Sequence, residues 1–267
     1  MTKPDINVEI AVIVLSCDKY SDLWGPFFTL FDKHWPTCPF PTYLLANQKR
    51  MEHTKYITLL SGEDKDWSTS FKKQLQQVNE SYVLLFFDDA LISKDVASES
   101  VAKIQNIISA YKPDYFRFRP YPKPKIWLEE NVGRFAIDEP YRTALYAAWK
   151  KDVLLDLLVE GESAWQFEMQ SVPRSEKYKE FLGTDYAFFS PVHGVEKGLW
   201  LRPAVRFLRQ NNIPIDLGYR RQMDRFEALQ SQIKWIRGKL YIITPEFVQK
   251  KLISLSGFIR QNIWSNW

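Results

Sequence analysis

The stretch that decides the fold is Tyr82-Val83-Leu84-Leu85-Phe86-Phe87-Asp88-Asp89-Ala90-Leu91-Ile92. Its first six residues are apolar or aromatic, and such a run predicts a strand buried on both faces, as in a parallel sheet. Two adjacent carboxylates follow at the carboxyl end of this strand, where open α/β sheets bind their ligands. Neighbouring anions repel each other, so we expect a compensating cation, and a divalent metal bound to a phosphate would supply it.

The rest of the chain fits one large α/β domain around this strand. It has 267 residues and 45% hydrophobic content, which is enough for a full core. Further apolar runs predict strands at 10–15, 42–47, 56–60, 115–119 and 186–189. Apolar residues at helical spacing predict helices at about 21–34, 67–78, 95–110 and 150–159. Strands that alternate with helices in this way predict a mostly parallel sheet covered by helices.

The C-terminal part differs from the rest in charge. Lys197 to Trp267 contains 13 Lys or Arg against 4 Asp or Glu, although the net charge of the whole chain is only +4. Helices are predicted at 203–210 and 224–237 and from Thr244 onward. We therefore expect a basic helical extension over 201–267 that lies near membrane headgroups or a phosphorylated acceptor. A solvated charged face is the alternative.

Several classes of protein are disfavoured by the motifs. The start of the chain does not resemble a signal peptide, and the apolar runs are too short to span a bilayer. Cys17 and Cys38 lack zinc-type spacing and fit a reducing cytosol. No dinucleotide-binding glycine motif follows the first strand, and the sequence has no phosphate-binding Walker loop. The basic part has no recognisable nucleic-acid motif, so we expect no nucleic-acid partner.

Asp88, Asp89 and His193 are candidates for metal binding. Carboxylate oxygens suit Mg²⁺ or Mn²⁺, and these ions take further ligands from substrate phosphates and water. The alternative for Asp88 and Asp89 is a turn whose acids are solvated or cap a helix. His193 lies in a loop punctuated by proline and glycine, where an imidazole would complete a metal site or contact a phosphate.

Glu168 is the candidate general base. A base that assists transfer to a hydroxyl contributes roughly 10²–10⁴-fold to the rate. The neighbours Trp165 and Phe167 would partly desolvate Glu168 and so increase its basicity. A surface loop with incidental acids is the alternative for 162–168. Asp18, after the first strand, would accept a hydrogen bond from a nucleobase or ribose hydroxyl, or serve only as an acid at a helix N-terminus.

Together these features resemble a GT-A glycosyltransferase, similar to bacterial enzymes of capsule, lipopolysaccharide and O-antigen biosynthesis. The resemblance covers about residues 8–200. It is carried by Val12-Ile13-Val14-Leu15-Ser16-Cys17-Asp18, by Phe86-Phe87-Asp88-Asp89 as a variant of the Asp-x-Asp motif, by Gly161-Glu162-Ser163-Ala164-Trp165-Gln166-Phe167-Glu168, and by His193.

The resemblance implies a Rossmann-like catalytic domain over 1–200, with a donor half at about 1–120 and an acceptor half at about 121–200. It implies that a nucleotide-sugar contacts Ser16, Asp18, Trp67 and Asp88. Mn²⁺ or Mg²⁺ would be held by Asp88, Asp89 and His193. Glu168 would be the base if the enzyme inverts, and Glu162 and Trp165 would contact the acceptor.

We therefore expect a glycosyltransferase that moves a sugar from a nucleotide-sugar to a hydroxyl of a glycan or lipid-linked glycan in surface polysaccharide biosynthesis. We expect it in the cytoplasm at the inner face of the membrane, with peripheral contact through 244–267. The alternative is a non-catalytic carbohydrate-binding or assembly protein that keeps the fold without the chemistry.

Overall fold

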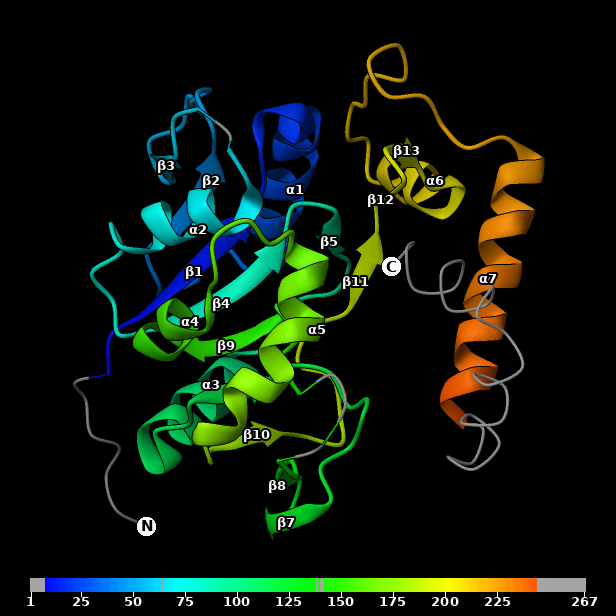
Figure 1. Ribbon diagram of the computed structural model, residues 1–267. Helices are drawn as coiled ribbons and strands as arrows, with labels where there is room; N and C mark the ends of the chain where they lie inside the picture. Colours follow the sequence, from blue (N-terminus) through cyan, green and yellow to red (C-terminus); the bar gives the residue numbers. More distant parts are fainter. Residues whose placement is uncertain (1–7, 64, 138, 140–141, 244–267) are drawn as a thin grey trace. The chain divides into compact units, whose positions relative to one another are not determined.

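The computed structural model describes residues 8–63, 65–137, 139 and 142–243. The chain divides into two compact units, residues 1–192 and 193–267 (Figure 1). The strands that lie in the first unit or begin in it are β1 (Ile10–Leu15), β2 (Thr42–Ala46), β3 (Ile57–Leu60), β4 (Tyr82–Phe87), β5 (Ala90–Ile92), β6 (Tyr115–Arg117), β7 (Ile126–Glu129), β8 (Val132–Arg134), β9 (Ala147–Lys150), β10 (Phe181–Gly183) and β11 (Pro191–His193). Its α-helices are α1 (Ser21–His34), α2 (Trp67–Leu75), α3 (Ser98–Tyr111), α4 (Lys151–Leu157) and α5 (Ala164–Arg174).

A single large sheet organises the first unit. Within the described residues its strand order is β3-β2-β1-β4-β9-β6-β10-β8-β7. The four strands β3, β2, β1 and β4 are all parallel, and β1 pairs with β2 on one side and β4 on the other. β9 lies between β4 and β6 and is antiparallel to both. The predicted α/β class, with a largely parallel central sheet flanked by helices, is confirmed.

Both faces of the sheet are buried at its central strands β1 and β4, as the unbroken apolar runs predict. Every residue of β1 is buried, and so are the first five of β4. Successive side chains of a strand point to opposite faces. Ala11, Ile13 and Leu15 belong to a core cluster that also contains side chains of α2, α4 and α5. On β4, Phe86 contacts Trp35, the residue that follows α1, with ring centroids 6.4 Å apart.

Local signals explain the start of two helices. Asp66 caps α2 by accepting a hydrogen bond from the Thr69 N–H at 2.8 Å. Ser163 caps α5, and the side chain of Gln166 accepts from the Ser163 N–H in return, which completes a capping box. The alternative that 162–168 is a surface loop is therefore wrong for residues 164–168, because α5 begins at Ala164.

Three other local predictions need correction. The alternation of Tyr115-Phe116-Arg117-Phe118-Arg119 predicts a strand with one solvated face, but Arg117 is 2% exposed, so this face is not solvated there. Tyr186–Phe189 is irregular and not a strand, although Phe188 and Phe189 are buried. Pro26 is expected only in the first turn of the helix predicted at 21–34, but it lies in the second turn, because the helix begins at Ser21.

The second unit contains a tight hairpin and two helices. These elements are β12 (Val195–Glu196), β13 (Leu199–Trp200), α6 (Arg202–Gln210) and α7 (Arg225–Ile243). Lys197 and Gly198 form the two-residue turn with φ of 51° and 75°, as a turn with two positive φ angles requires. The predicted membrane-contacting segment 244–267 lies outside the described residues. No described helix is both long enough and apolar enough to cross a membrane.

Candidate functional site

The candidate site lies where the chain leaves β1 and β4. From β1 the chain continues to β2 on one side, whereas β4 pairs with β1 on the other side. A point where strand order reverses in this way leaves a crevice outside the carboxyl ends of the two strands, where open sheets bind ligands. Leu15 is paired with Phe87, so Ser16 and Asp88 are brought together just beyond the sheet.

A hydrogen-bond chain fixes the first side chains of this edge. The Trp24 Nε1–H donates to Ser16 Oγ at 2.7 Å, and the Ser16 hydroxyl donates to an Asp88 carboxylate oxygen. Asp88 is 6% exposed, and its N–H donates to the Leu15 carbonyl at 3.3 Å. Because Asp88 and Asp89 form the turn between β4 and β5, their place at the end of the buried strand agrees with the sequence prediction.

Asp18 holds the loop that follows β2. Its carboxylate accepts hydrogen bonds from three successive backbone N–H groups, those of Asn47 at 2.9 Å, Gln48 at 3.1 Å and Lys49 at 3.2 Å. The Asp18 N–H in turn donates to Asn47 Oδ1 at 3.1 Å. The carboxylate thereby ties the loops after β1 and β2 together and shapes one wall of the crevice. A contact of Asp18 with a nucleotide remains a prediction.

Replacing Asp18 with Ala is expected to lower the free energy of unfolding by about 1–2 kcal/mol, because three backbone N–H groups lose their acceptor. Asp18→Asn keeps one side-chain oxygen and should cost less. Urea unfolding of the three proteins gives the values. Unchanged stability of Asp18→Ala, with weaker nucleotide binding, would show that Asp18 acts on a ligand and not on the loops.

The residues at this turn fit a divalent cation only in part. Two carboxylates on one turn are the protein share of ligands that Mg²⁺ or Mn²⁺ often takes when phosphates and water supply the others. Among the described residues, no group of three or more His, Cys, Asp or Glu side chains is placed to hold a metal ion. Asp88 and Asp89 would therefore hold such an ion together with its phosphate ligand. Metal binding stays a prediction.

His193, the third predicted ligand, lies at the end of β11. It is the first residue of the second unit and is exposed at the end of β11. β11 pairs with β5, the strand that begins directly after Asp89, and the metal-binding role of His193 remains a prediction.

Glu168 reaches the same edge of the sheet through β9. The strand is antiparallel to β4, so the residues just before it, Leu145 and Tyr146, lie beside the carboxyl end of β4. The Tyr146 ring contacts the Phe86 ring with centroids 5.4 Å apart. The Leu145 N–H donates to Glu168 Oε1 at 2.7 Å, whereas Oε2 has no hydrogen-bond partner within the described part of the chain.

The environment of Glu168 suits a general base. Burial raises the pKa of Glu168, while the Leu145 N–H and the guanidinium groups of Arg117 and Arg119 lower it. Burial is the largest of these effects, so the net shift is upward. A carboxylate with a raised pKa takes a proton more readily than an exposed one, provided that the pH keeps it ionised.

Glu162 is built into the fold more firmly than the sequence suggests. It is 6% exposed, and its two carboxylate oxygens accept from both terminal nitrogens of Arg174 at 2.6 and 2.8 Å. The Glu162 N–H also donates to Ser68 Oγ at 3.1 Å. Its carboxylate therefore forms a structural ion pair between the start and the end of α5. An acceptor contact of Glu162 remains a prediction.

The two candidate tryptophans differ in their surroundings. Trp67 begins α2 and packs on Phe71 and Phe167, with ring centroids 5.2 and 5.9 Å apart. Trp165 on α5 is 37% exposed and so has ring surface available to a ligand. Asp66, next to Trp67, also accepts from the Gly161 N–H at 3.1 Å, which ties the start of α2 to the segment before α5. Their ligand contacts remain predictions.

Arg117 and Tyr146 lie close to the site but were not predicted. The Arg117 guanidinium lies over the Phe135 ring at 4.9 Å and donates from Nε to the Tyr115 hydroxyl at 2.9 Å. Its Nη2 and the Tyr146 hydroxyl are buried and have no hydrogen-bond partner within the described residues. Aromatic residues and arginines alternate over 115–119, which is compatible with a buried arginine, but a strand with one solvated face explained the alternation equally well.

No protein family and no curated protein matches the sequence. Among solved structures, the chain is similar to residues 1–349 of S. aureus TarS, with TM-score 0.48 and 12% identity over 68% of this chain and 59% of that chain. The same TarS fragment in complex with UDP-GlcNAc gives TM-score 0.46 and 12% identity over 76% and 65%. UDP-glucose pyrophosphorylase complexed with UDP-glucose gives 0.45 and 10% over 69% and 92%. The chain thus spans less than two thirds of these TarS structures. Likenesses at this level assign no reaction to this chain.

Proposed function

We propose that the first unit is a glycosyltransferase that moves a sugar from a nucleotide-sugar to a hydroxyl of a glycan or lipid-linked glycan. The observation that carries this proposal is the gathering of Ser16, Asp88 and Asp89 with the partly buried Glu168 at one edge of the sheet. A pair of acids at the crevice suits a cation and a diphosphate, and a separate carboxylate of raised pKa suits proton removal from a hydroxyl.

Each residue of the site has a separate role in the proposed transfer. Ser16 orients the Asp88 carboxylate, and Asp88 with Asp89 would hold a divalent ion against the diphosphate. Such an ion supplies positive charge that stabilises the leaving group. Glu168, held through Oε1 by the Leu145 N–H, takes the proton from the acceptor hydroxyl at Oε2 as the oxygen attacks the anomeric carbon. Trp165 offers an apolar ring face to the acceptor sugar.

The wider role that we propose is in surface polysaccharide biosynthesis. The donor half at 1–120 would carry the nucleotide-sugar site, and the acceptor half at 121–200 would carry Glu168. His193 would complete the metal or phosphate contacts. The basic segment 201–267 would keep the protein at an anionic membrane surface by peripheral contact through 244–267.

A thermal-shift screen tests the donor. We expect one of UDP-, GDP-, dTDP- or CMP-sugars to raise the melting temperature in the presence of Mn²⁺, and slow hydrolysis of that nucleotide-sugar to follow. Asp89→Asn is expected to lower the hydrolysis rate about 10–100-fold, as the loss of a group that holds the metal does. Glu99→Gln removes one exposed charge on α3 and should leave the rate unchanged.

The same screen can overturn the proposal. A protein that only binds carbohydrate would be stabilised by glycans alone and would not respond to any nucleotide-sugar. Equal hydrolysis rates for Asp89→Asn and the unaltered protein would remove Asp89 from the site.

A further inference from the structure

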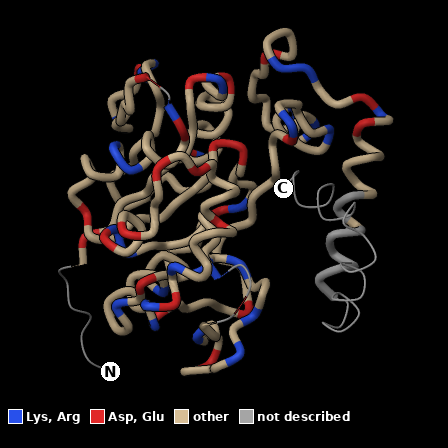
Figure 2. Tube along the Cα trace, in the orientation of Figure 1, with Lys and Arg blue, Asp and Glu red and all other residues tan. Residues whose placement is uncertain are grey.

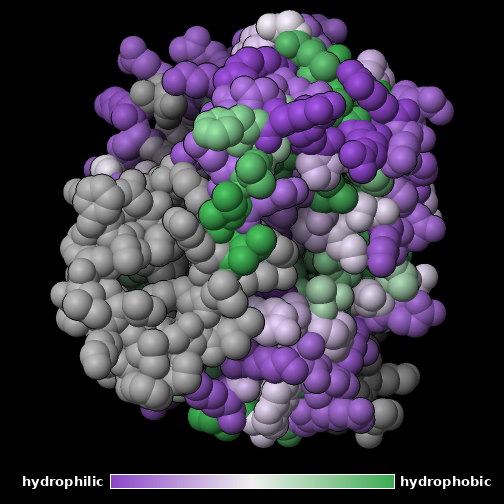
Figure 3. Space-filling view, turned by 90° about the vertical axis from the view of Figure 1, so that its right-hand side faces the viewer, coloured by the Kyte–Doolittle hydropathy of each residue, from purple (hydrophilic) through white to green (hydrophobic). Residues whose placement is uncertain are grey.

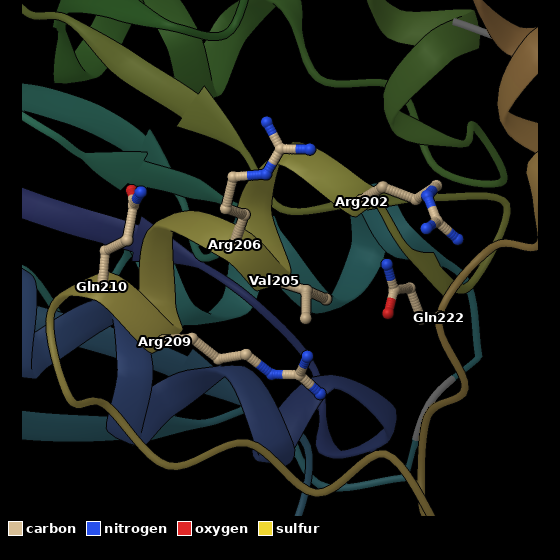
Figure 4. Close-up of a pocket in the computed structure, with 6 residues that line it drawn as sticks. All are labelled: Arg202, Val205, Arg206, Arg209, Gln210 and Gln222. Carbon is tan, nitrogen blue, oxygen red and sulfur yellow. The ribbon is translucent and has the colours of Figure 1, made fainter.

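The second unit carries a separate cavity that is lined by arginines. Its volume is about 400 Å³, and it is lined by Arg202, Val205, Arg206, Arg209, Gln210 and Gln222 (Figure 4). Five of these residues belong to α6, and Gln222 follows later in the chain. The arginines are spaced by four and three residues, so they share one face of the helix. Figure 2 shows the arginine positions of α6 in blue.

The fold of the second unit holds this arginine face in position. Ala204 and Leu208 are buried on the other side of α6, and Val205 is buried at the margin of the cavity, whereas the three arginines are exposed. The Met223 N–H donates to the Trp200 carbonyl at 2.9 Å, and the Trp200 N–H donates to the Arg221 carbonyl at 3.1 Å. These two bonds fix Gln222 beside β13, so the amide and the helix form a defined site.

The acids of the second unit that fall within the described residues are engaged elsewhere. Glu227 forms a two-bond ion pair with Arg221 at 2.6 and 2.8 Å. Asp216 accepts from the Gly218 N–H at 2.8 Å, and Asp224 accepts from the Glu227 N–H at 2.8 Å. Glu196 accepts from the Ser231 hydroxyl. Within the described residues, Arg202, Arg206 and Arg209 therefore have no carboxylate partner, and the cavity carries an uncompensated positive charge.

We propose that this cavity binds a phosphate ester group carried by a hydroxyl-bearing ligand. Guanidinium groups bind phosphate oxygens through paired, charge-assisted hydrogen bonds, and three of them match the several oxygens of a phosphate better than the two of a carboxylate. Gln210 and Gln222 supply amide donors and acceptors for neighbouring hydroxyls. The volume is in the range of sites for small organic ligands.

The apolar surface of α7 is a different feature and does not enter this site. Phe226, Leu229, Ile233 and Ile236 of α7 are 67%, 53%, 41% and 50% exposed, and Figure 3 shows apolar side chains among polar ones on a face of the molecule. The phosphate site rests on residues of the second unit alone. Its failure therefore leaves sugar transfer by the first unit untouched, and the reverse is also true.

Calorimetric titration of the full chain tests the site with inorganic phosphate, glucose 6-phosphate and glucose. We expect glucose 6-phosphate to bind more tightly than phosphate, and glucose to give no signal. Arg206→Gln should weaken binding about tenfold or more, because a charge-assisted hydrogen bond is lost. Arg225→Gln is the matched control, since Arg225 is exposed in the same unit but does not line the cavity, and it should bind like the unaltered protein.

Vesicle binding identifies the source of the phosphate. Phosphatidylcholine vesicles with and without phosphatidylglycerol are compared for the unaltered protein and Arg206→Gln. Vesicle binding that needs phosphatidylglycerol and Arg206 supports a lipid headgroup, whereas tighter binding of glucose 6-phosphate supports a soluble or glycan-borne phosphate ester. If Arg206→Gln and Arg225→Gln lose binding of glucose 6-phosphate or of vesicles equally, the binding reflects only general charge attraction, and the proposal is overturned. Equal binding of glucose and glucose 6-phosphate, or no binding of either, would also overturn it.

Discussion

Replacing Glu168 with Gln is expected to lower turnover about 10²–10⁴-fold, because the amide keeps the shape of the side chain but cannot take up the proton of the acceptor. The amide oxygen can still accept from the Leu145 N–H, which donates to Glu168 at 2.7 Å, so the protein should remain folded. The measurement is kcat with the nucleotide-sugar found in the thermal-shift screen, together with its binding constant, which we expect to be unchanged.

Glu160→Gln is the control for this variant. Glu160 is exposed, and its substitution removes the same charge without touching the site, so kcat should be that of the unaltered protein. If Glu168→Gln retains most of the turnover, or if both variants lose it equally, Glu168 is not the base.

The pH dependence provides a second readout of the same residue. Burial raises the pKa of Glu168, so turnover should be high above that raised pKa and should fall as the pH drops through it. The acid limb is therefore expected at a higher pH than an exposed glutamate would give. Arg119→Gln removes a positive charge that lowers the pKa of Glu168, and the limb should then move to still higher pH. If the acid limb of the pH profile stays in place in Arg119→Gln, the ionisation of Glu168 does not control turnover.

Replacing Arg174 with Met is expected to lower the free energy of unfolding by about 3 kcal/mol, since it leaves the Glu162 carboxylate without its partner. The Glu162 side chain is 7% exposed and that of Arg174 is 28% exposed, so water can replace little of the lost pairing. Urea unfolding gives the value. Adding Glu162→Gln to Arg174→Met should restore part of the stability, because the unpaired charge is then gone.

Arg134 provides the matched comparison. It pairs with Glu180 at 2.9 Å, but both side chains are 35% exposed, so Arg134→Met should cost less than about 1 kcal/mol. Equal costs for Arg134→Met and Arg174→Met would contradict the structural role of Glu162. A large rise in the KM of the acceptor with little change in stability would point to the acceptor contact instead.

The long buried strands and α6 could be predicted from the sequence because their burial leaves an unambiguous pattern. Ile10–Leu15 and Tyr82–Phe87 are apolar throughout, and the strands have these bounds in the structure. β9 and β10 are only four and three residues long, too short for a pattern to separate them from the surrounding apolar segments. The spacing Ser163-x-x-Gln166 is typical of a capping box and is the signal in the sequence from which α5 could have been predicted.

The candidate site was predictable only where strand order was implied. The carboxyl ends of parallel strands lie at one edge of a sheet, so Asp88 could be placed at that edge from the sequence. Ser16 was named only from the resemblance, and the pairing of β1 with β4 that brings the two together is seen in the structure. Glu168 approaches the same edge because β9 is antiparallel to β4. The residues of Ala147–Lys150 do not indicate the direction of this strand. The partners of buried charges could not be predicted from the sequence either. Arg174 lies 12 residues from Glu162, and the two side chains meet only in the folded chain.

The place of β9 also affects how the protein is made. In the sheet it lies between β4 and β6, but in the chain it follows both. About 60 residues separate Phe87 from Ala147, and at ribosomal speeds of about 5–20 residues per second they take several seconds to emerge. During that interval one edge of β4, an apolar strand, has no partner strand in the nascent chain. Open apolar edges invite pairing with other chains, so this protein should depend on chaperones more than its final sheet suggests, and slower translation should prolong the exposure.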